Sequence, residues 1–467
     1  MSQFLKVFLL IFAVKIVFGI LVPMSTDEAY YWFWGQHPQL SYFDHPAMVS
    51  WLFFLGSKLD ALFSQAGLQF SRVPSIALAH ASIYFWYLIF KEYLSEKKLG
   101  LLLFFILLSP LWGVGSIIVT PDAPLVFFWS LSIYLLTQIS KICENTQVDK
   151  SVSNSKLLFY YGLMGASLGL GFCSKYHIIL FVPAAFLYVI AEKKWFLLRP
   201  LGIIVCILSG LVFSSPVLIW NYQNDFISFK FQLQHGLATN NSWQIRWPVE
   251  YVLGQFLLIF PPVFWAAIKK PKEMNLKILY YFGWFPILFF LLTSIKSKVE
   301  ANWPIAAYPA LTCLGFYALQ NAKSLKVTMV VWATAWLLVI GQILVPWVPI
   351  DEREIKTYEL KKYNSLSAFY QKALSENSEN FYASSYQMAS MISYRTRFTL
   401  PLIYKAIGMS RIDYFDFQAE STPKNKRFYI LNETLQPLSK ELLDLGYREV
   451  SSTPIDGTFR LVLAGKE

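Results

Sequence analysis

The sequence is poor in charged residues and in residues that form disulfide bonds or bind metals. Only 15% of its 467 residues are Asp, Glu, Lys or Arg, and it has four cysteines and five histidines. The cysteines lack CxxC spacing, the hydrophilic C-terminal part has none, and no HExxH pattern occurs. We therefore predict free structural thiols and expect no cofactor. An internal repeat of the transporter kind is also missing.

Apolar and aromatic residues take the place of charge. Hydrophobic residues make up 55% of the chain, aromatic residues 18%, and the mean hydropathy is +0.43, which predicts a polytopic membrane protein. The net charge of +11 is spread over short Lys/Arg clusters between apolar runs. Such clusters set membrane orientation, so nucleic acid is not expected as a partner.

A membrane-spanning helix needs about 20 apolar residues. This criterion predicts eleven transmembrane helices, near 4–22, 73–90, 99–118, 122–140, 157–173, 177–191, 196–219, 248–268, 278–295, 304–320 and 326–346. The run 4–22 lacks a cleavage motif and is interpreted as a retained helix rather than a signal peptide. The stretch 46–63 is interpreted as an interfacial helix, although a twelfth span is the alternative.

The basic clusters fall in alternate loops, which the positive-inside rule places in the cytoplasm. The other connections then face outward: 23–72, 119–122, 174–176, 220–247, 296–303 and the tail after 346. Most unusual polar residues lie in these outward loops: Asp27, Glu28, Asp44, Asp122, Lys175, Asn221, His235, Lys298, Glu300 and Asn302. We therefore predict one shared site on the outer face of the membrane.

The tail has a different composition from the rest. A helix over 382–395, a strand over 428–432, a helix over 434–445 and strands over 447–451 and 458–463 are predicted. The expected fold class is thus an all-α polytopic membrane protein with a small C-terminal α/β domain. We place the transmembrane domain at 1–346, including loop 23–72, and the α/β domain outside the membrane at 347–467.

The first outer loop holds the acids best suited to general base catalysis. Asp27 and Glu28 precede AYYWFW, where a carboxylate can accept a proton, but Thr26-Asp27-Glu28 also has the pattern of a helix start. Asp44 and His45 follow an aromatic run. With Asp27 and His37 they form a possible divalent-ion cage, although hydrogen bonding to a sugar or a neighbouring backbone is preferred.

Later outward loops add an acid, cations and amides. Asp122 lies in VTPDAP, where a first-turn helix acid is the structural alternative. Lys175 is a lone cation between two apolar runs and suits a phosphate, with snorkelling to the interface as the alternative. Arg246, Lys298 and His235 are further cations for the same anion. The strings at 220–226, 231–236 and 300–309 offer amides and aromatics to a sugar, although an aromatic belt has the same composition.

Several strings occur together in a specific order: TDEAYYW, FDHPAM, RVPS at 72–75, TPDAP at 120–124, GLGFCSKY at 169–176, WN at 220–221 and EANWP at 300–304. As a set they resemble the bacterial branch of the dolichyl-phosphate-mannose protein mannosyltransferase superfamily. The similarity is greatest to lipopolysaccharide galacturonosyltransferases and, more distantly, to lipid A aminoarabinose transferases. It covers about residues 1–345. The long insertion of protein mannosyltransferases is missing, which disfavours a protein acceptor.

This resemblance implies a GT-C glycosyltransferase of the bacterial inner membrane with its active site on the periplasmic side. Its partners are a polyprenyl-phosphate sugar as donor and lipid A or lipopolysaccharide as acceptor. By analogy Asp27 is the catalytic acid residue, and Glu28 and Asp44 are supporting acids. The substrate-binding residues expected are Asp122, Lys175, Tyr176, His45, Asn221, His235, Arg246, Asn302 and Trp303, with no metal.

The predicted reaction is a single inverting displacement in which polyprenyl phosphate departs. Alternatives remain at this stage. A protein O-mannosyltransferase has the same donor chemistry, a lipid-linked sugar transporter or flippase also needs many spans, and a non-catalytic scaffold for envelope assembly needs no catalytic acid.

Overall fold

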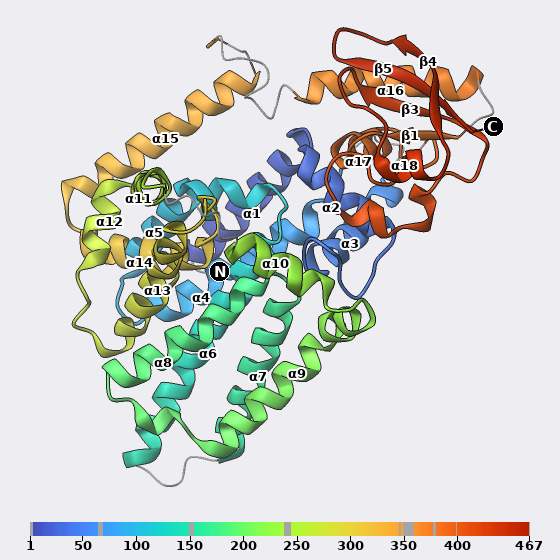
Figure 1. The fold of residues 1–467 in the computed structure, drawn as a ribbon. Helices are drawn as coiled ribbons and strands as arrows, with labels where there is room; N and C mark the ends of the chain where they lie inside the picture. Colours follow the sequence, from blue (N-terminus) through green and yellow to red (C-terminus); the bar gives the residue numbers. More distant parts are fainter. Residues whose placement is uncertain are drawn as a thin grey trace. The chain divides into compact units, whose positions relative to one another are not determined.

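The computed structural model describes residues 3–63, 69–148, 154–237, 244–344, 347–348, 359–376, 380–397 and 399–466. The described chain is mainly helical (Figure 1). It divides into two compact units, Met1–Gly19 with His45–Val49 and Arg72–Val345, and Ile20–Asp44 with Ser50–Ser71 and Pro346–Glu467. Most of loop 23–72 is thus grouped with the C-terminal residues, whereas the division from sequence assigned this loop to the membrane domain.

Apolar helices make up the first unit. Among the described residues, six helices are long and apolar enough to cross a membrane, and the number rises to eight at most if each of two bent pairs is one span. The predicted number of eleven spans is therefore not confirmed. The six are α1 (Gln3–Leu21), α4 (Val73–Phe90), α6 (Asp122–Val148), α9 (Pro200–Gln223), α13 (Lys277–Ser294) and α15 (Lys323–Leu344).

Prolines break two of the predicted spans. The run 99–118 forms α5 (Glu96–Leu108), which ends at Ser109, and the chain bends by 80° before η2 (Pro110–Val114) and η3 (Gly115–Ile117). The run 248–268 forms α11 (Arg246–Ile259) and α12 (Pro261–Ile268), with a bend of 97° at Phe260. A residue before proline is disfavoured in the α conformation, and Phe260 has φ 72°. Hydropathy alone does not report such breaks.

The remaining apolar runs form shorter or less apolar helices. They are α7 (Asn154–Phe172), η4 (Tyr176–Leu180) with α8 (Phe181–Ala191), and η7 (Ile305–Ala307) with α14 (Tyr308–Leu319). The last two helical stretches are each shorter than 18 residues. The stretch 46–63 forms α3 (Met48–Leu62), a helix of 15 residues. Two further helices of this part of the chain are α10 (Ile227–Leu237) and η6 (Met274–Leu276).

Small residues let α7 and α9 lie side by side (Figure 1). A Cβ atom on Gly165 would overlap the carbonyl oxygen of Cys206, and one on Gly169 would lie 2.9 Å from Cβ of Phe213. Close backbone approach at glycine is a common basis of helix association in membranes, where burial of apolar surface supplies little driving force. This packing fixes the end of α7, from which the candidate site residue Lys175 follows.

A five-stranded sheet forms the centre of the second unit. Its order is β2-β1-β3-β5-β4, in which β1 pairs in parallel with β2 and β3, and β5 pairs antiparallel with β3 and β4. The strands are β1 (Phe381–Ala383), β2 (Tyr404–Lys405), β3 (Arg427–Glu433), β4 (Arg448–Pro454) and β5 (Phe459–Gly465). The strands predicted at 428–432, 447–451 and 458–463 are confirmed as β3, β4 and β5.

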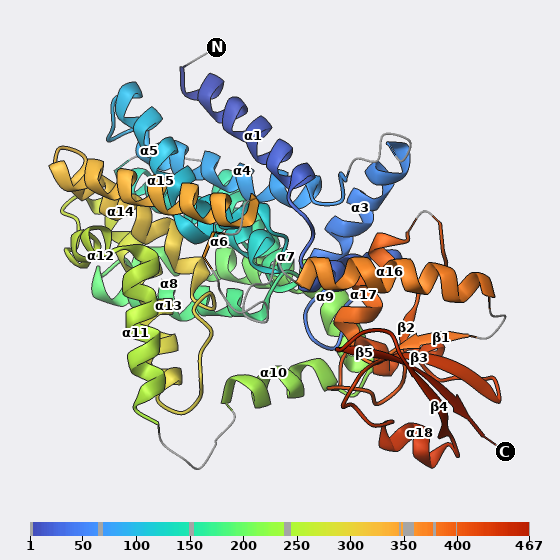
Figure 2. The same ribbon diagram turned by 90° about the horizontal axis from the view of Figure 1, so that it is seen from above.

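Helices of the second unit pack beside this sheet and on one another. Helix α16 (Glu359–Glu376) lies near the sheet (Figure 2). Its Tyr370 ring meets Phe381 of β1 edge to face, with ring centroids 5.7 Å apart. The predicted helix 382–395 is α17 (Tyr386–Arg395), and the helix predicted at 434–445 is shorter, as α18 (Lys440–Asp444). Helix α2 (Thr26–Gln36) packs against α17, and Trp32 meets Tyr394 edge to face at 5.1 Å. The acids in the first turn of α2 are therefore held in place by the packing of this helix on α17.

Candidate functional site

Three predicted polar residues meet in the first unit. The Lys175 ammonium lies 2.6 Å from Asp122 Oδ1, and the Asn302 amide donates to Asp122 Oδ2 at 2.8 Å. The side chains of Lys175 and Asp122 are 11% and 7% exposed. Removing two charges from water costs free energy, which is offset only when the buried groups have good hydrogen-bond geometry. A buried pair that also receives an amide hydrogen bond therefore indicates a candidate functional site. Segments that are distant in the sequence converge here, as the outward-loop assignment predicts.

Local structure places each of the three groups. Asp122 begins α6 after a proline turn, and its N–H donates to Thr120 Oγ1 at 3.3 Å. Lys175 is extended between α7 and η4, and its N–H donates to the Gly171 carbonyl at 3.0 Å. Asn302 lies in the loop between α13 and η7. Asp122 and Lys175 thus lie next to helix ends, and Asn302 lies in a connecting loop.

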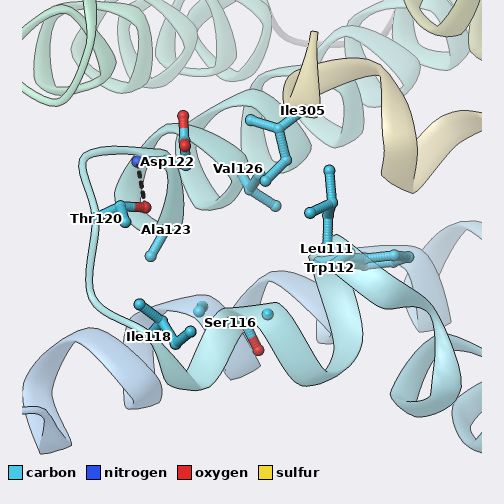
Figure 3. Close-up of a pocket in the computed structure, with 11 residues that line it drawn as sticks. Leu111, Trp112, Ser116, Ile118, Thr120, Asp122, Ala123, Val126 and Ile305 are labelled. Atoms are coloured by element: carbon cyan, nitrogen blue, oxygen red, sulfur yellow. Dashed lines mark hydrogen bonds between the residues drawn. The ribbon is translucent and has the colours of Figure 1, made fainter. Parts of the chain in front are cut away.

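A small pocket adjoins Asp122 (Figure 3). Its polar lining groups are Ser116, Thr120 and Asp122, and most other lining residues are apolar, including Leu111, Trp112, Ile118, Val126 and Ile305. Behind this wall the buried Lys15 ammonium donates to Ser116 Oγ at 2.8 Å. The pocket next to Asp122 is thus small and lined mainly by apolar side chains.

A second set of contacts lies around the same end of α7. The Tyr176 phenol pairs with Ser228 Oγ at 2.9 Å, and Asn221 donates to the Tyr176 oxygen at 3.5 Å. The segment that contains His45 is held here as well, because the Met48 N–H donates to the Cys173 carbonyl at 2.9 Å. Asn221 also accepts from the Phe229 N–H at 3.3 Å, so it links α9 to α10 and has an evident structural role.

The other predicted substrate-binding residues of this unit are placed differently. The Trp303 ring lies tilted to that of His177 and edge to face with that of Phe290, with ring centroids 5.9 and 5.8 Å apart. Arg246 pairs with Glu250 at 2.5 Å within its own helix, and its side chain is 78% exposed. The structure therefore does not bring Arg246 to Lys175. The side chain of His235 lies outside the described residues.

In the second unit, Asp44 is the most constrained of the predicted acids. It is buried, and Oδ2 accepts a hydrogen bond of 2.6 Å from the Tyr30 phenol. Tyr30 in turn accepts from the Tyr414 N–H at 2.9 Å. Burial raises the pKa of the Asp44 carboxyl above its ordinary value, while the Tyr30 hydrogen bond and the charge of Arg411 act in the opposite direction.

Residues from the C-terminal part of the second unit also contact Asp44. Arg411 Nη2 lies 3.6 Å from Asp44 Oδ1, and its guanidinium lies over the Tyr386 ring at 4.6 Å. Burial raises the pKa of Tyr386 to about 12, with a smaller contribution from the charge of Asp27. Sequence reasoning missed Arg411 and Tyr386. No string around either residue distinguishes it, and only the fold brings it to the first loop.

Asp27 and Glu28 occupy the first turn of α2. The N-cap is Ser25, whose N–H donates to Glu28 Oε2 at 3.0 Å and whose Oγ accepts from the Glu28 N–H at 3.3 Å. This capping box gives the buried Glu28 a structural role. Asp27, one position earlier, is only partly buried. The helix start predicted at these residues is confirmed, and their catalytic roles stay predictions.

The first unit thus holds a lysine–aspartate ion pair, and the second unit holds several carboxylates of the first loop. Across the described ranges, no group of three or more His, Cys, Asp or Glu side chains is placed to hold a metal ion. The cage suggested for Asp27, His37, Asp44 and His45 therefore gains no support from the geometry. His37 instead contacts the Tyr404 hydroxyl at 3.1 Å.

Comparison with known proteins gives both sequence and fold similarity. Residues 44–220 match the family model described as dolichyl-phosphate-mannose-protein mannosyltransferase. The lipid A galacturonosyltransferase RgtD of Rhizobium johnstonii is 24% identical over 327 residues, which are 67% of this chain and 64% of RgtD. An uncharacterized protein of Aquifex aeolicus is 24% identical over 342 residues, 69% of this chain and 64% of that protein. The matched region thus spans less than two thirds of either relative.

The fold is similar to that of ArnT from Cupriavidus metallidurans over nearly the whole chain. The crystal structure of ArnT bound to undecaprenyl phosphate superimposes with a TM-score of 0.68 at 14% identity, covering 99% of this chain and 97% of ArnT. The apo structure gives a TM-score of 0.63 at 13% identity with the same coverage. Both the matched family and the shared fold confirm the predicted resemblance of this chain to the GT-C glycosyltransferases of the protein mannosyltransferase superfamily.

Proposed function

We propose that this chain is a membrane glycosyltransferase that moves a sugar from a polyprenyl-phosphate donor to lipid A or the lipopolysaccharide core. The observation that carries this proposal is the buried Lys175–Asp122 pair, assembled with Asn302 from three distant segments. Support comes from RgtD, which is named for lipid A galacturonosyl transfer, and from ArnT, whose structure holds undecaprenyl phosphate. The site faces the periplasm of the bacterial inner membrane in this proposal.

Lys175 provides the charge that the leaving group requires. Its ammonium has three N–H donors, and Asp122 is the one side-chain partner that the described residues give it. Two donors therefore stay available to a phosphate oxygen, and the negative charge that develops as polyprenyl phosphate departs is stabilised there. Asn302 holds Asp122 in the orientation that positions the lysine.

The acids of the first loop act on the acceptor. An acceptor oxygen attacks the anomeric carbon of the donor, the bond from that carbon to the phosphate oxygen breaks, and the configuration inverts. Asp27 takes the proton of an acceptor hydroxyl, or orients an acceptor phosphate that is already ionised. Asp44, fixed by Tyr30, supports this acid, and Glu28 holds the start of α2.

Mass spectrometry of lipid A and core oligosaccharide tests this proposal. A deletion strain should lack one sugar that its parent carries, and the intact gene should restore it. The D27N variant should restore it poorly, while D444N, which changes an exposed acid on α18, should restore it fully. Identical lipid A and core from deletion strain and parent would contradict the proposed acceptor.

A protein O-mannosyltransferase is the second candidate, favoured by the description of the family that residues 44–220 match. In that case the deletion strain would lose sugar from envelope proteins and keep its lipid A unchanged. Glycopeptide analysis of the same two strains separates the two acceptors.

A further inference from the structure

Arg411 is held on two sides but lacks a hydrogen-bond acceptor for its guanidinium. The guanidinium carbon lies 4.6 Å from the centre of the Tyr386 ring, and Nη2 lies 3.6 Å from Asp44 Oδ1. The latter distance is too long for a hydrogen bond, and Tyr30 already donates to the other Asp44 oxygen at 2.6 Å. Within the described parts of the chain, no acceptor lies within hydrogen-bond distance of the guanidinium N–H groups, whereas the Arg411 backbone N–H donates to Ser410 Oγ at 2.6 Å. The side chain is 54% exposed.

The loop that carries Arg411 is fixed by a buried charge cluster. The fully buried Lys405 ammonium donates to the Arg411 carbonyl at 2.8 Å and pairs with Asp413 and Asp416 at 2.8 and 2.6 Å. Asp416 also accepts from the Gly408 N–H at 2.8 Å. These contacts hold both ends of the loop, so the position of Arg411 is set before any ligand binds.

The backbone next to Arg411 is in a conformation that few residues adopt. Ser410 has φ 60°, and Gly408 has φ 69°. A non-glycine residue in the left-handed region costs free energy, and such residues concentrate where a side chain must be aimed. The Ser410 conformation turns the chain so that Arg411 meets Tyr386 and Asp44.

The charge of Arg411 is close enough to offset that of Asp44. This interaction is not a hydrogen bond, so it does not occupy the N–H donors of the guanidinium. A guanidinium that stacks on an aromatic ring keeps its edge and its five N–H donors directed outward. The matching ligand is a carboxylate or a phosphate, which accepts two parallel hydrogen bonds. Asp44 lies on one side of the group, and the exposed side is open to such an oxyanion.

We propose that Arg411 binds a phosphate group of a lipid substrate. The inference rests on the proposed function, since it assigns Arg411 to the surroundings of the acids that act on the acceptor. Two phosphorylated lipids have the required chemistry, the polyprenyl-phosphate donor and the phosphorylated lipid A acceptor. The donor offers a phosphodiester and lipid A offers phosphate monoesters, and each has two unesterified oxygens that can accept two parallel hydrogen bonds from the guanidinium edge.

Lipid binding to the full chain in nanodiscs tests the proposal. The probes are undecaprenyl phosphate with undecaprenol as its neutral counterpart, and bisphosphorylated lipid A with dephosphorylated lipid A. The R411Q variant should bind one of the two phosphorylated lipids at least about 10-fold more weakly, because a charge-assisted bidentate pair is lost. R411K should be intermediate, because an ammonium is a point charge. R427Q, which changes an exposed arginine at the start of β3, should match wild type.

The pattern of losses identifies the source of the phosphate. Weaker binding of undecaprenyl phosphate alone assigns Arg411 to the donor, and weaker binding of bisphosphorylated lipid A alone assigns it to the acceptor. Equal affinity of wild type and R411Q for both phosphorylated lipids, including no binding of either, overturns the proposal. An equal loss of a neutral counterpart also overturns it, since a general disturbance of the fold then explains the result.

The proposed function and this inference fail in different ways. If R411Q binds and transfers as wild type does, the transferase assignment stands and Arg411 has no part in substrate binding. If wild type transfers no sugar but R411Q selectively loses a phosphorylated lipid, the phosphate site stands without the transferase.

Discussion

Lys175 and Asp122 are 53 positions apart in the chain, and their side chains form an ion pair of 2.6 Å that is almost excluded from solvent. The removal of one partner leaves an unpaired buried charge. We expect K175M and D122N each to lower the free energy of unfolding by about 3–5 kcal/mol.

The double variant D122N/K175M should lose clearly less than the sum of the two single losses, because no buried charge is then left unpaired. Thermal unfolding of the four purified proteins in one detergent measures this coupling. Additive losses would show that the two groups do not act as a pair.

The hydrogen bond between Tyr30 and Asp44 gives a second prediction. The Y30F variant removes the donor to Asp44 and the acceptor of the Tyr414 N–H, both of which are buried. We expect a loss of about 1–3 kcal/mol in the free energy of unfolding. The matched variant Y429F changes a tyrosine of β3 and should lose less. Chemical unfolding of the two variants provides the comparison, and equal stability would contradict the role of Tyr30.

Sequence patterns predicted most of the helices and strands. Span 73–90 coincides with α4, because composition and a proline in the first turn both define it. The break at Phe260 was missed, because a hydropathy window averages across it. The C-terminal strands were found from alternation of apolar residues, whereas the parallel pairing of β1 with β3 depends on contacts far apart in the sequence.

The candidate site was predictable only where topology constrains it. The assignment of outward loops predicted that Asp122, Lys175 and Asn302 share one side of the membrane. In the structure their side chains are in contact. No such rule applies to Arg411, because it lies in the hydrophilic tail, where hydropathy and charge give no side assignment. Its approach to Asp44 follows from the folding of the C-terminal residues with the first loop.

Asp413 predicts a pH dependence of stability. Burial raises its pKa to about 7, and the charge of Lys405 acts in the opposite direction. Lys405 also pairs with Asp416, so a neutral Asp413 leaves no unpaired lysine. The unfolded carboxyl releases its proton near pH 4. Between about pH 4 and 7 the folded state thus binds the extra proton, and stability falls as pH rises.

The slope in this range is at most about 1.4 kcal/mol per pH unit, and D413N should flatten it. Unfolding midpoints of wild type and D413N at pH 4.5, 5.5 and 6.5 measure the difference. An unchanged slope in D413N would assign the pH dependence to another group.

The close packing of α7 on α9 predicts different outcomes for two glycines. G165A places a methyl group against the Cys206 carbonyl, so the helices must separate, and we expect a loss of about 1–3 kcal/mol. G100A in α5 has open space and should change stability by no more than about 1 kcal/mol, towards greater stability. Thermal unfolding of both variants checks the contrast. Equal effects would show that backbone contact at Gly165 is not what holds α7 to α9.

Transfer of a labelled sugar by the purified full chain tests the central proposal most directly. Wild type should form a covalent sugar–lipid A product from an undecaprenyl-phosphate sugar. D27N should do so about 10²–10⁴-fold more slowly, whereas D444N should match wild type. Movement of the labelled lipid across a vesicle membrane without a covalent product, or equal rates for D27N and wild type with verified donor and acceptor, would contradict the account.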